Sequence, residues 1–86
     1  EFSLNQIYPN PFNPLTTIQY DIAAKGETSL RIFDLSGRLI ETLIHENLEP
    51  GHHEIKWKPT NIPSGLYFIE LRSGTERNIQ KITLLK

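Results

Sequence analysis

Apolar and polar residues alternate along most of the chain from Thr16 onward, which is typical of strands with one buried face. In residues 16–22 the apolar side chains of Ile18, Tyr20 and Ile22 fall on one face. The segment 39–44 has apolar residues at a spacing that a helix would also allow, but its short length between turn signals favours a strand. The pattern therefore predicts strands over 16–22, 28–34, 39–44, 52–57, 66–72 and 77–85.

Turn signals separate these strands. Residues 34–38 predict a tight hairpin connection, in which Asp34 bonds its own downstream backbone and Gly37 takes a positive φ. Residues 45–50 form a polar run that Pro50-Gly51 closes, and we expect a loop there. Turns or irregular loops are also predicted over 23–27, 58–65 and 73–75.

The last strand changes phase. Ile79 fits one face, whereas Ile82 and Leu84 fit the other, so a β-bulge near Gln80 would bring them onto the same side.

The first fifteen residues differ in kind from the rest. Prolines at 9, 11 and 14 fix φ and bias each preceding residue toward extended backbone, so this stretch is not a central strand. We expect one domain over 1–86, in which the Pro-rich segment 1–15 packs on a β-sandwich formed by 16–86. Residues 2–4 are a candidate for a seventh strand, and six or seven strands at this spacing predict an all-β sandwich.

Length and composition exclude several classes of function. A chain of 86 residues buries only about 60–65% of its unfolded surface, which leaves little room for a deep catalytic cleft. There is no Cys, which excludes disulfides, zinc sites with thiolate ligands and a cysteine nucleophile. A net charge of −1 without a basic stripe argues against nucleic acid as a partner. No apolar run is long enough to span a membrane, and no segment before Ile18 resembles a signal peptide. The chain begins at Glu1 rather than Met, so we expect a piece or the tail of a larger protein.

Side chains that could carry chemistry do not form a site in the sequence. His52 and His53 are neighbours on a strand and point to opposite faces, while His45 lies across a turn, so we expect no metal and no cofactor. The carboxylates are dispersed, and Glu41, Glu54 and Glu70 are expected on exposed outer faces. Neither Ser36-Gly37 nor Ser64-Gly65 has a supporting histidine. We predict no catalytic residues.

Two further groups of residues have simple structural interpretations. Four aromatic residues could form a sugar-stacking platform, but aromatic residues at inward strand positions favour the core, and Trp57 is in phase with Ile55. The four are Tyr8, Tyr20, Trp57 and Tyr67. At the hairpin, Arg38 and Arg31 are predicted to pair with Asp34 on the surface, where the contact contributes little.

The final segment has two interpretations. Residues 80–86 place Ile82 and Leu84 on one face with flanking lysines. They could be a terminal strand whose charges prevent edge pairing, or a strand that another protein recognises by adding to its edge.

A series of motifs follows in order along nearly the whole chain. They are Phe2-Ser3-Leu4, Tyr8-Pro9-Asn10-Pro11-Phe12-Asn13-Pro14 with Thr16-Thr17-Ile18 and Tyr20, Asp34-Leu35-Ser36-Gly37-Arg38, Gly51-His52-His53 with Trp57, Ser64-Gly65-Leu66-Tyr67-Phe68 and Lys81-Ile82-Thr83-Leu84-Leu85-Lys86. Together these motifs resemble the type A C-terminal sorting domains of the type IX (Por) secretion system. One difference is that Lys58-Pro59 follows Trp57, where family members often have Asp-Gly.

The resemblance implies an immunoglobulin-like β-sandwich of about seven antiparallel strands, similar to the Ig-like part of flagellar hook-capping proteins. It further implies a non-catalytic export signal on a larger cargo protein in Bacteroidetes and their relatives. Its partners would be the outer-membrane translocon and a sortase-like peptidase, with passage through the periplasm to the cell surface or the exterior. The recognition residues that it implies are Gly65, Tyr67, Lys81, Ile82, Thr83, Leu84, Leu85 and Lys86.

Two other hypotheses share the same fold. The domain could be a carbohydrate-binding module on a secreted enzyme, with exposed aromatic residues as the platform, or an inert spacer.

Overall fold

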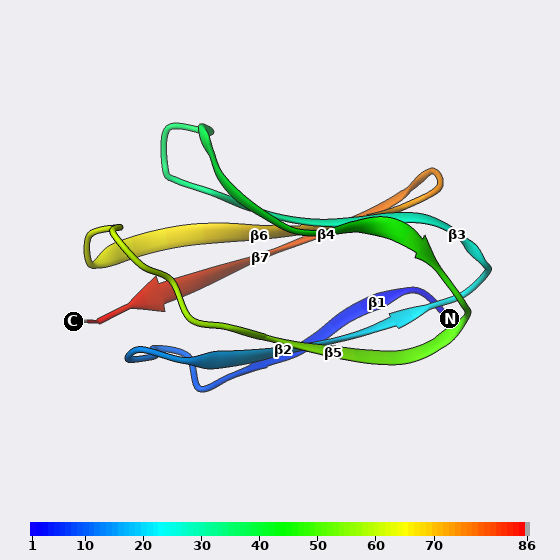
Figure 1. Cartoon of the computed structure of the whole chain (residues 1–86), viewed down its shortest axis with the longest axis horizontal. Coiled ribbons are helices and arrows are strands. Elements are labelled where there is room, and N and C mark those ends of the chain that lie inside the picture. The colour runs from blue at the N-terminus through cyan, green and yellow to red at the C-terminus, as the bar shows by residue number, and fades with distance from the viewer. Residues whose placement is uncertain (86) are drawn as a thin grey trace.

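The computed structural model describes residues 1–85 as two β-sheets packed face to face (Figure 1). Within these residues there is no helix, and the strands pair antiparallel in the orders β1-β2-β5 and β4-β3-β6-β7. The predicted all-β sandwich of about seven strands is therefore confirmed. The strands are β1 (Ser3–Tyr8), β2 (Thr16–Ile22), β3 (Gly26–Phe33), β4 (Leu39–Leu48), β5 (Gly51–Trp57), β6 (Gly65–Ser73) and β7 (Glu76–Leu84).

The division of strands between the sheets is Ig-like. In immunoglobulin-type sandwiches the first, second and fifth strands share one sheet, whereas the third, sixth and seventh share the other. Here β4 pairs with β3 and so joins the second sheet as an edge strand. The N-terminus and the end of β7 lie at opposite ends of the molecule (Figure 1), and β7 forms the other edge of the four-stranded sheet.

A single hydrophobic core fills the space between the sheets. The alternation in β2 is confirmed, since Ile18, Tyr20 and Ile22 are all buried. Burial also raises the pKa of Tyr20 to about 12, and the nearby Glu46 carboxylate adds to the shift. The remaining core residues are Leu4, Ile7, Phe12, Leu30, Ile32, Trp57, Tyr67, Ile69, Leu71, Ile82 and Leu84.

The hairpin between β3 and β4 forms as predicted. The Asp34 carboxylate accepts hydrogen bonds from the backbone amides of Ser36 and Arg38, at 2.9 and 3.0 Å, and from the Ser36 hydroxyl. Gly37 has a φ of 88°. The Ser36 and Arg38 bonds lower the pKa of Asp34 to about 2, because they favour the charged carboxylate.

The predicted loop over 45–50 is wrong for residues 45–48, which belong to a strand. β4 continues to Leu48, and its residues 46–48 pair with 26–28 at the start of β3. On an edge strand the backbone pairs with one neighbour while most side chains face water, so a polar run does not end the strand. The strand ends at Leu48, and the turn that follows contains Pro50, which has no backbone donor.

The predicted bulge near Gln80 is also wrong. β6 and β7 pair in one continuous register from Gly65↔Leu84 to Ser73↔Glu76. Ile79 faces outward and is 44% exposed, so Gln80 takes the inward position. Its side-chain amide donates to the backbone carbonyls of Leu4 (2.6 Å) and Asn5 (2.7 Å) on β1. The polar side chain is thus accommodated between the sheets because β1, whose own register is irregular between Leu4 and Ile7, offers two acceptors.

Candidate functional site

The end of β7 separates the predicted recognition residues into two groups. Ile82 and Leu84 point into the core and are almost completely buried. Lys81 and Leu85 are exposed, and Thr83 is half-buried. Lys86, which the resemblance also implied, lies outside the described residues.

A short N-terminal segment covers the outer edge of β7. We call residues 10–12 the strap. The Phe12 amide donates to the Thr83 carbonyl at 3.0 Å, and the Leu85 amide donates to the Phe12 carbonyl at 2.9 Å. These two bonds make a parallel bridge between the Phe12 and Leu84 positions.

The Asn10 side chain extends this contact along β7. Its carbonyl oxygen accepts a hydrogen bond from the Thr83 amide at 3.0 Å, and its amide group donates to the Lys81 carbonyl at 3.2 Å. The strap therefore satisfies outward backbone groups from Lys81 to Leu85, which an edge strand would otherwise leave open.

The strap is anchored by an aromatic side chain. Phe12 is 1% exposed, and its ring centroid lies 5.5 Å from that of Trp57 at a tilt of 44°. The Trp57 indole in turn donates to the Glu41 carboxylate at 3.0 Å. Sequence reasoning missed this anchor, and the signal that could have found it is a lone Phe among prolines and asparagines.

Gly65 and Tyr67 lie beside the end of β7. Gly65 pairs with Leu84 and has a φ of 150°, a conformation that side chains rarely adopt. Tyr67 pairs with Ile82 and is buried, and its hydroxyl donates to the Pro63 carbonyl at 2.6 Å. A tyrosine near the start of the sixth strand that bonds back to upstream backbone is the tyrosine corner of Ig-like sandwiches. Burial raises the pKa of Tyr67, and the Asp34 carboxylate adds to this shift.

The aromatic residues do not form a surface platform. Tyr20, Trp57 and Tyr67 are core residues, which confirms the structural interpretation. Tyr8 is 68% exposed and stands apart from them on the surface.

The histidines bind different partners. His45 contacts the Glu27 carboxylate, His52 the Asp21 carboxylate and His53 the Glu49 carbonyl. Residues 1–85 contain no group of three or more His, Asp or Glu side chains arranged to hold a metal ion. In the same range, no helix has the length and apolar character of a membrane span.

The prediction that Glu70 is exposed is wrong. Glu70 is 5% exposed on the outer face of the sheet, where it accepts hydrogen bonds from Arg31 at 2.8 Å and from Arg77 at 2.6 Å. Burial raises the pKa of Glu70, but the two arginines outweigh it, so the net shift is downward. Arg31 therefore pairs with Glu70 rather than with Asp34, because the register places Arg31 and Glu70 opposite each other. The Arg38–Asp34 pair is confirmed at 3.2 Å.

Comparison with known proteins assigns the chain to a family. The sequence matches the family described as "Secretion system C-terminal sorting domain" over residues 6–85. Neither the curated proteins nor the solved structures gave a match. Domains of this family are generally non-catalytic signals that interact with the type IX machinery and direct an attached cargo toward the cell surface or the exterior. Since the match includes the strap and nearly all seven strands, the chain belongs to the C-terminal sorting domains of type IX secretion.

Proposed function

We propose that the outer-membrane translocon recognises this sorting domain in its folded state, at the end of β7. The observation that supports this is the division of side chains along that strand. Ile82 and Leu84 are locked between the sheets, so a partner that meets the folded domain contacts Lys81, Thr83 and Leu85 instead. Lys86 belongs to this proposal on the resemblance alone.

In this proposal Gly65 and Tyr67 act as positioning residues. Gly65 allows β6 to begin directly opposite Leu84, and Tyr67 ties the preceding loop to the start of β6 through Pro63. Ile82 and Leu84 anchor β7 in the core. These four residues hold the exposed side chains of β7 in place, and none of them needs to touch the partner.

The strap limits the ways in which a partner can bind to β7. Strand addition requires free backbone donors and acceptors along an edge. Asn10 and Phe12 already use those groups between Lys81 and Leu85. We therefore propose that the translocon reads the outward side chains of β7 together with the strap, without adding a strand there.

We also propose the route that the resemblance implies. The cargo and its domain pass through the periplasm, and a sortase-like peptidase then separates the domain from the cargo at the cell surface. Family membership supports export toward the surface, and the peptidase step follows from it as a hypothesis.

Export of a cargo protein that carries this domain at its C-terminus tests the recognition surface. Lys81→Glu and Leu85→Asp change exposed side chains without touching the core, so we expect the domain to fold and most of the cargo to remain inside the cell. The matched control is Lys56→Glu, the same charge reversal at an exposed position on β5 of the other sheet. Circular dichroism of each purified domain verifies folding. Normal export of the folded β7 variants would refute recognition at this surface.

A further inference from the structure

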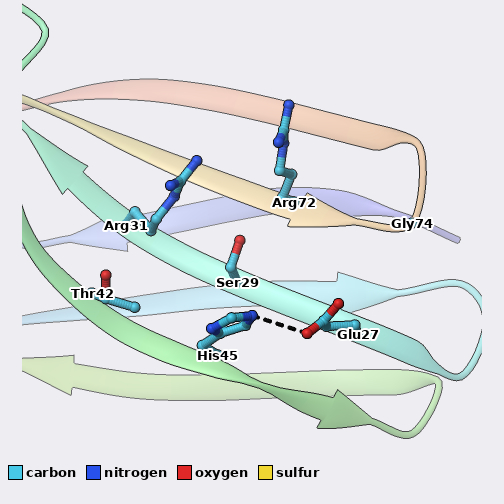
Figure 2. A pocket seen from close by; sticks show the side chains of 7 residues that line it. All are labelled: Glu27, Ser29, Arg31, Thr42, His45, Arg72 and Gly74. Carbon is cyan, nitrogen blue, oxygen red and sulfur yellow. Dashed lines mark hydrogen bonds and ion pairs between the residues drawn. The ribbon is translucent and has the colours of Figure 1, made fainter.

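The outer face of the four-stranded sheet carries a polar hollow that the sorting role does not use (Figure 2). Its volume is about 410 Å³, which falls within the roughly 300–1,000 Å³ of small-molecule sites. The lining side chains come from β3, β4 and β6, and those that matter here are Glu27, Ser29, Arg31, Thr42, His45 and Arg72.

The strand register creates this hollow. Ser29 in β3 pairs with His45 in β4 on one side and with Arg72 in β6 on the other. A small side chain between two long ones leaves a depression in the sheet surface. Arg31 follows two residues after Ser29 and so shares its face. Figure 2 shows the Ser29 hydroxyl between the two arginines, with the His45–Glu27 contact on the other side.

Several hydrogen-bond donors in the hollow have no partner. Arg31 uses Nη2 to bind Glu70, whereas its buried Nε has no hydrogen-bond acceptor. Within residues 1–85, neither the exposed Arg72 guanidinium nor the hydroxyls of Ser29 and Thr42 have a hydrogen bond or an ion pair. The donors that a ligand in the hollow can reach are therefore the Arg72 guanidinium and the two hydroxyls, whereas the Arg31 Nε is closed to solvent.

Charge also remains unbalanced here. Glu70 is shared between Arg31 and Arg77, and the Glu27 carboxylate, which also lines the hollow, contacts His45 rather than either arginine of the hollow. No carboxylate among the described residues pairs with Arg72. Arg31 and Arg72 stand at diagonal positions on neighbouring strands, where long side chains reach each other and like charges repel. An anion in the hollow would relieve that repulsion.

We propose that this hollow binds an oxyanion, namely the phosphate or carboxylate group of a small polar ligand. Guanidinium groups present several N–H donors that match both kinds of oxyanion. Arg31 is held ready by Glu70 and by the Phe33 ring, whose centroid lies 5.3 Å from the guanidinium carbon. Ser29 and Thr42 add hydroxyl donors to the lining. This inference is independent of the proposed recognition of β7.

Titration of the whole domain followed by amide NMR tests the site. The probes are sodium phosphate and sodium acetate, each added at constant ionic strength set with sodium chloride. We expect saturable shifts centred on Ser29, Thr42 and Arg72 with at least one of the two anions. Tighter binding of phosphate favours a ligand with a phosphate group, and tighter binding of acetate favours a ligand with a carboxylate.

Two variants and a control distinguish binding in the hollow from general attraction of anions to the positive charges of the domain. Arg72→Gln removes an exposed side chain without contacts and should weaken binding by about tenfold or more, as expected for loss of a charge-assisted bond. Ser29→Ala should weaken it less, with the fold retained. Lys56→Gln removes one positive charge from the other sheet and should leave the affinity unchanged. Absence of saturable shifts with both anions, or an equal loss in Arg72→Gln and Lys56→Gln, would overturn the proposal.

Discussion

The Tyr67 hydroxyl is a single polar group that ties the start of β6 to the loop before it. It is buried next to the end of β7, and it donates to the Pro63 carbonyl at 2.6 Å. Tyr67→Phe removes the donor and leaves that carbonyl without its partner. We expect the free energy of unfolding to fall by about 1–2 kcal/mol, the usual cost of losing a partly buried hydrogen bond. Urea denaturation measures it.

The matched control at the residue scale is Tyr8→Phe. Tyr8 is 68% exposed and its hydroxyl has no hydrogen bond within the described residues, so the same chemical change should have almost no effect. Equal stability losses in the two variants would mean that the hydrogen bond from Tyr67 to Pro63 contributes nothing to the free energy of unfolding.

At the scale of elements, the strap and β7 depend on one side chain. Asn10 binds both the Thr83 amide and the Lys81 carbonyl. Asn10→Ala should therefore expose the Thr83 amide to solvent and speed its hydrogen exchange by about five- to tenfold, corresponding to roughly 1 kcal/mol of local stability. Exchange at Ile69, which lies in the central strand β6, should change little.

Asn13→Ala provides the comparison for the strap. Asn13 lies in the same Pro-rich segment, is exposed, and has no hydrogen bond within residues 1–85. Its replacement should leave Thr83 exchange as it is. If the Thr83 amide also exchanged slowly in Asn10→Ala, the strap would not be the segment that protects the edge of β7.

Elements with one buried face could be predicted from the sequence, and elements defined by backbone pairing could not. Alternation in β2 reports directly on the core. The end of β4 could not be found this way, because its polar side chains face water while its backbone still pairs with β3. Gln80 looked like a phase break for a related reason, since its acceptors belong to β1, more than seventy residues away along the chain.

The candidate site was predictable only in part. Motif resemblance indicated the last strand and the residues beside it, including Tyr67. It did not distinguish core anchors such as Ile82 from exposed positions such as Lys81, because that depends on which way β7 faces the other sheet. The contact of Asn10 with β7 joins positions 10 and 81, and no local pattern reports such a contact.

For the molecule as a whole, long-range contacts join the two ends of the chain into one body. The radius of gyration is 12.4 Å, close to the roughly 12 Å expected for a compact domain of this length. β1 and the strap both contact β7, the former through Gln80 and the latter through Asn10 and Phe12. The sandwich is therefore closed along β7 by residues from the other end of the sequence, and we expect it to unfold as a unit.

Gln80→Glu tests this closure. The carboxylate cannot donate, so at neutral pH it places a negative charge against the carbonyls of Leu4 and Asn5 where the amide formerly bound both. We expect a loss of about 2–4 kcal/mol, since two hydrogen bonds are replaced by repulsion in a partly buried position. Gln6→Glu makes the same change at an exposed position on β1 and should cost little. Urea unfolding followed by both Trp57 fluorescence and circular dichroism should show one coincident transition, shifted only in Gln80→Glu. Separate transitions for the two probes would show instead that the sheets unfold independently.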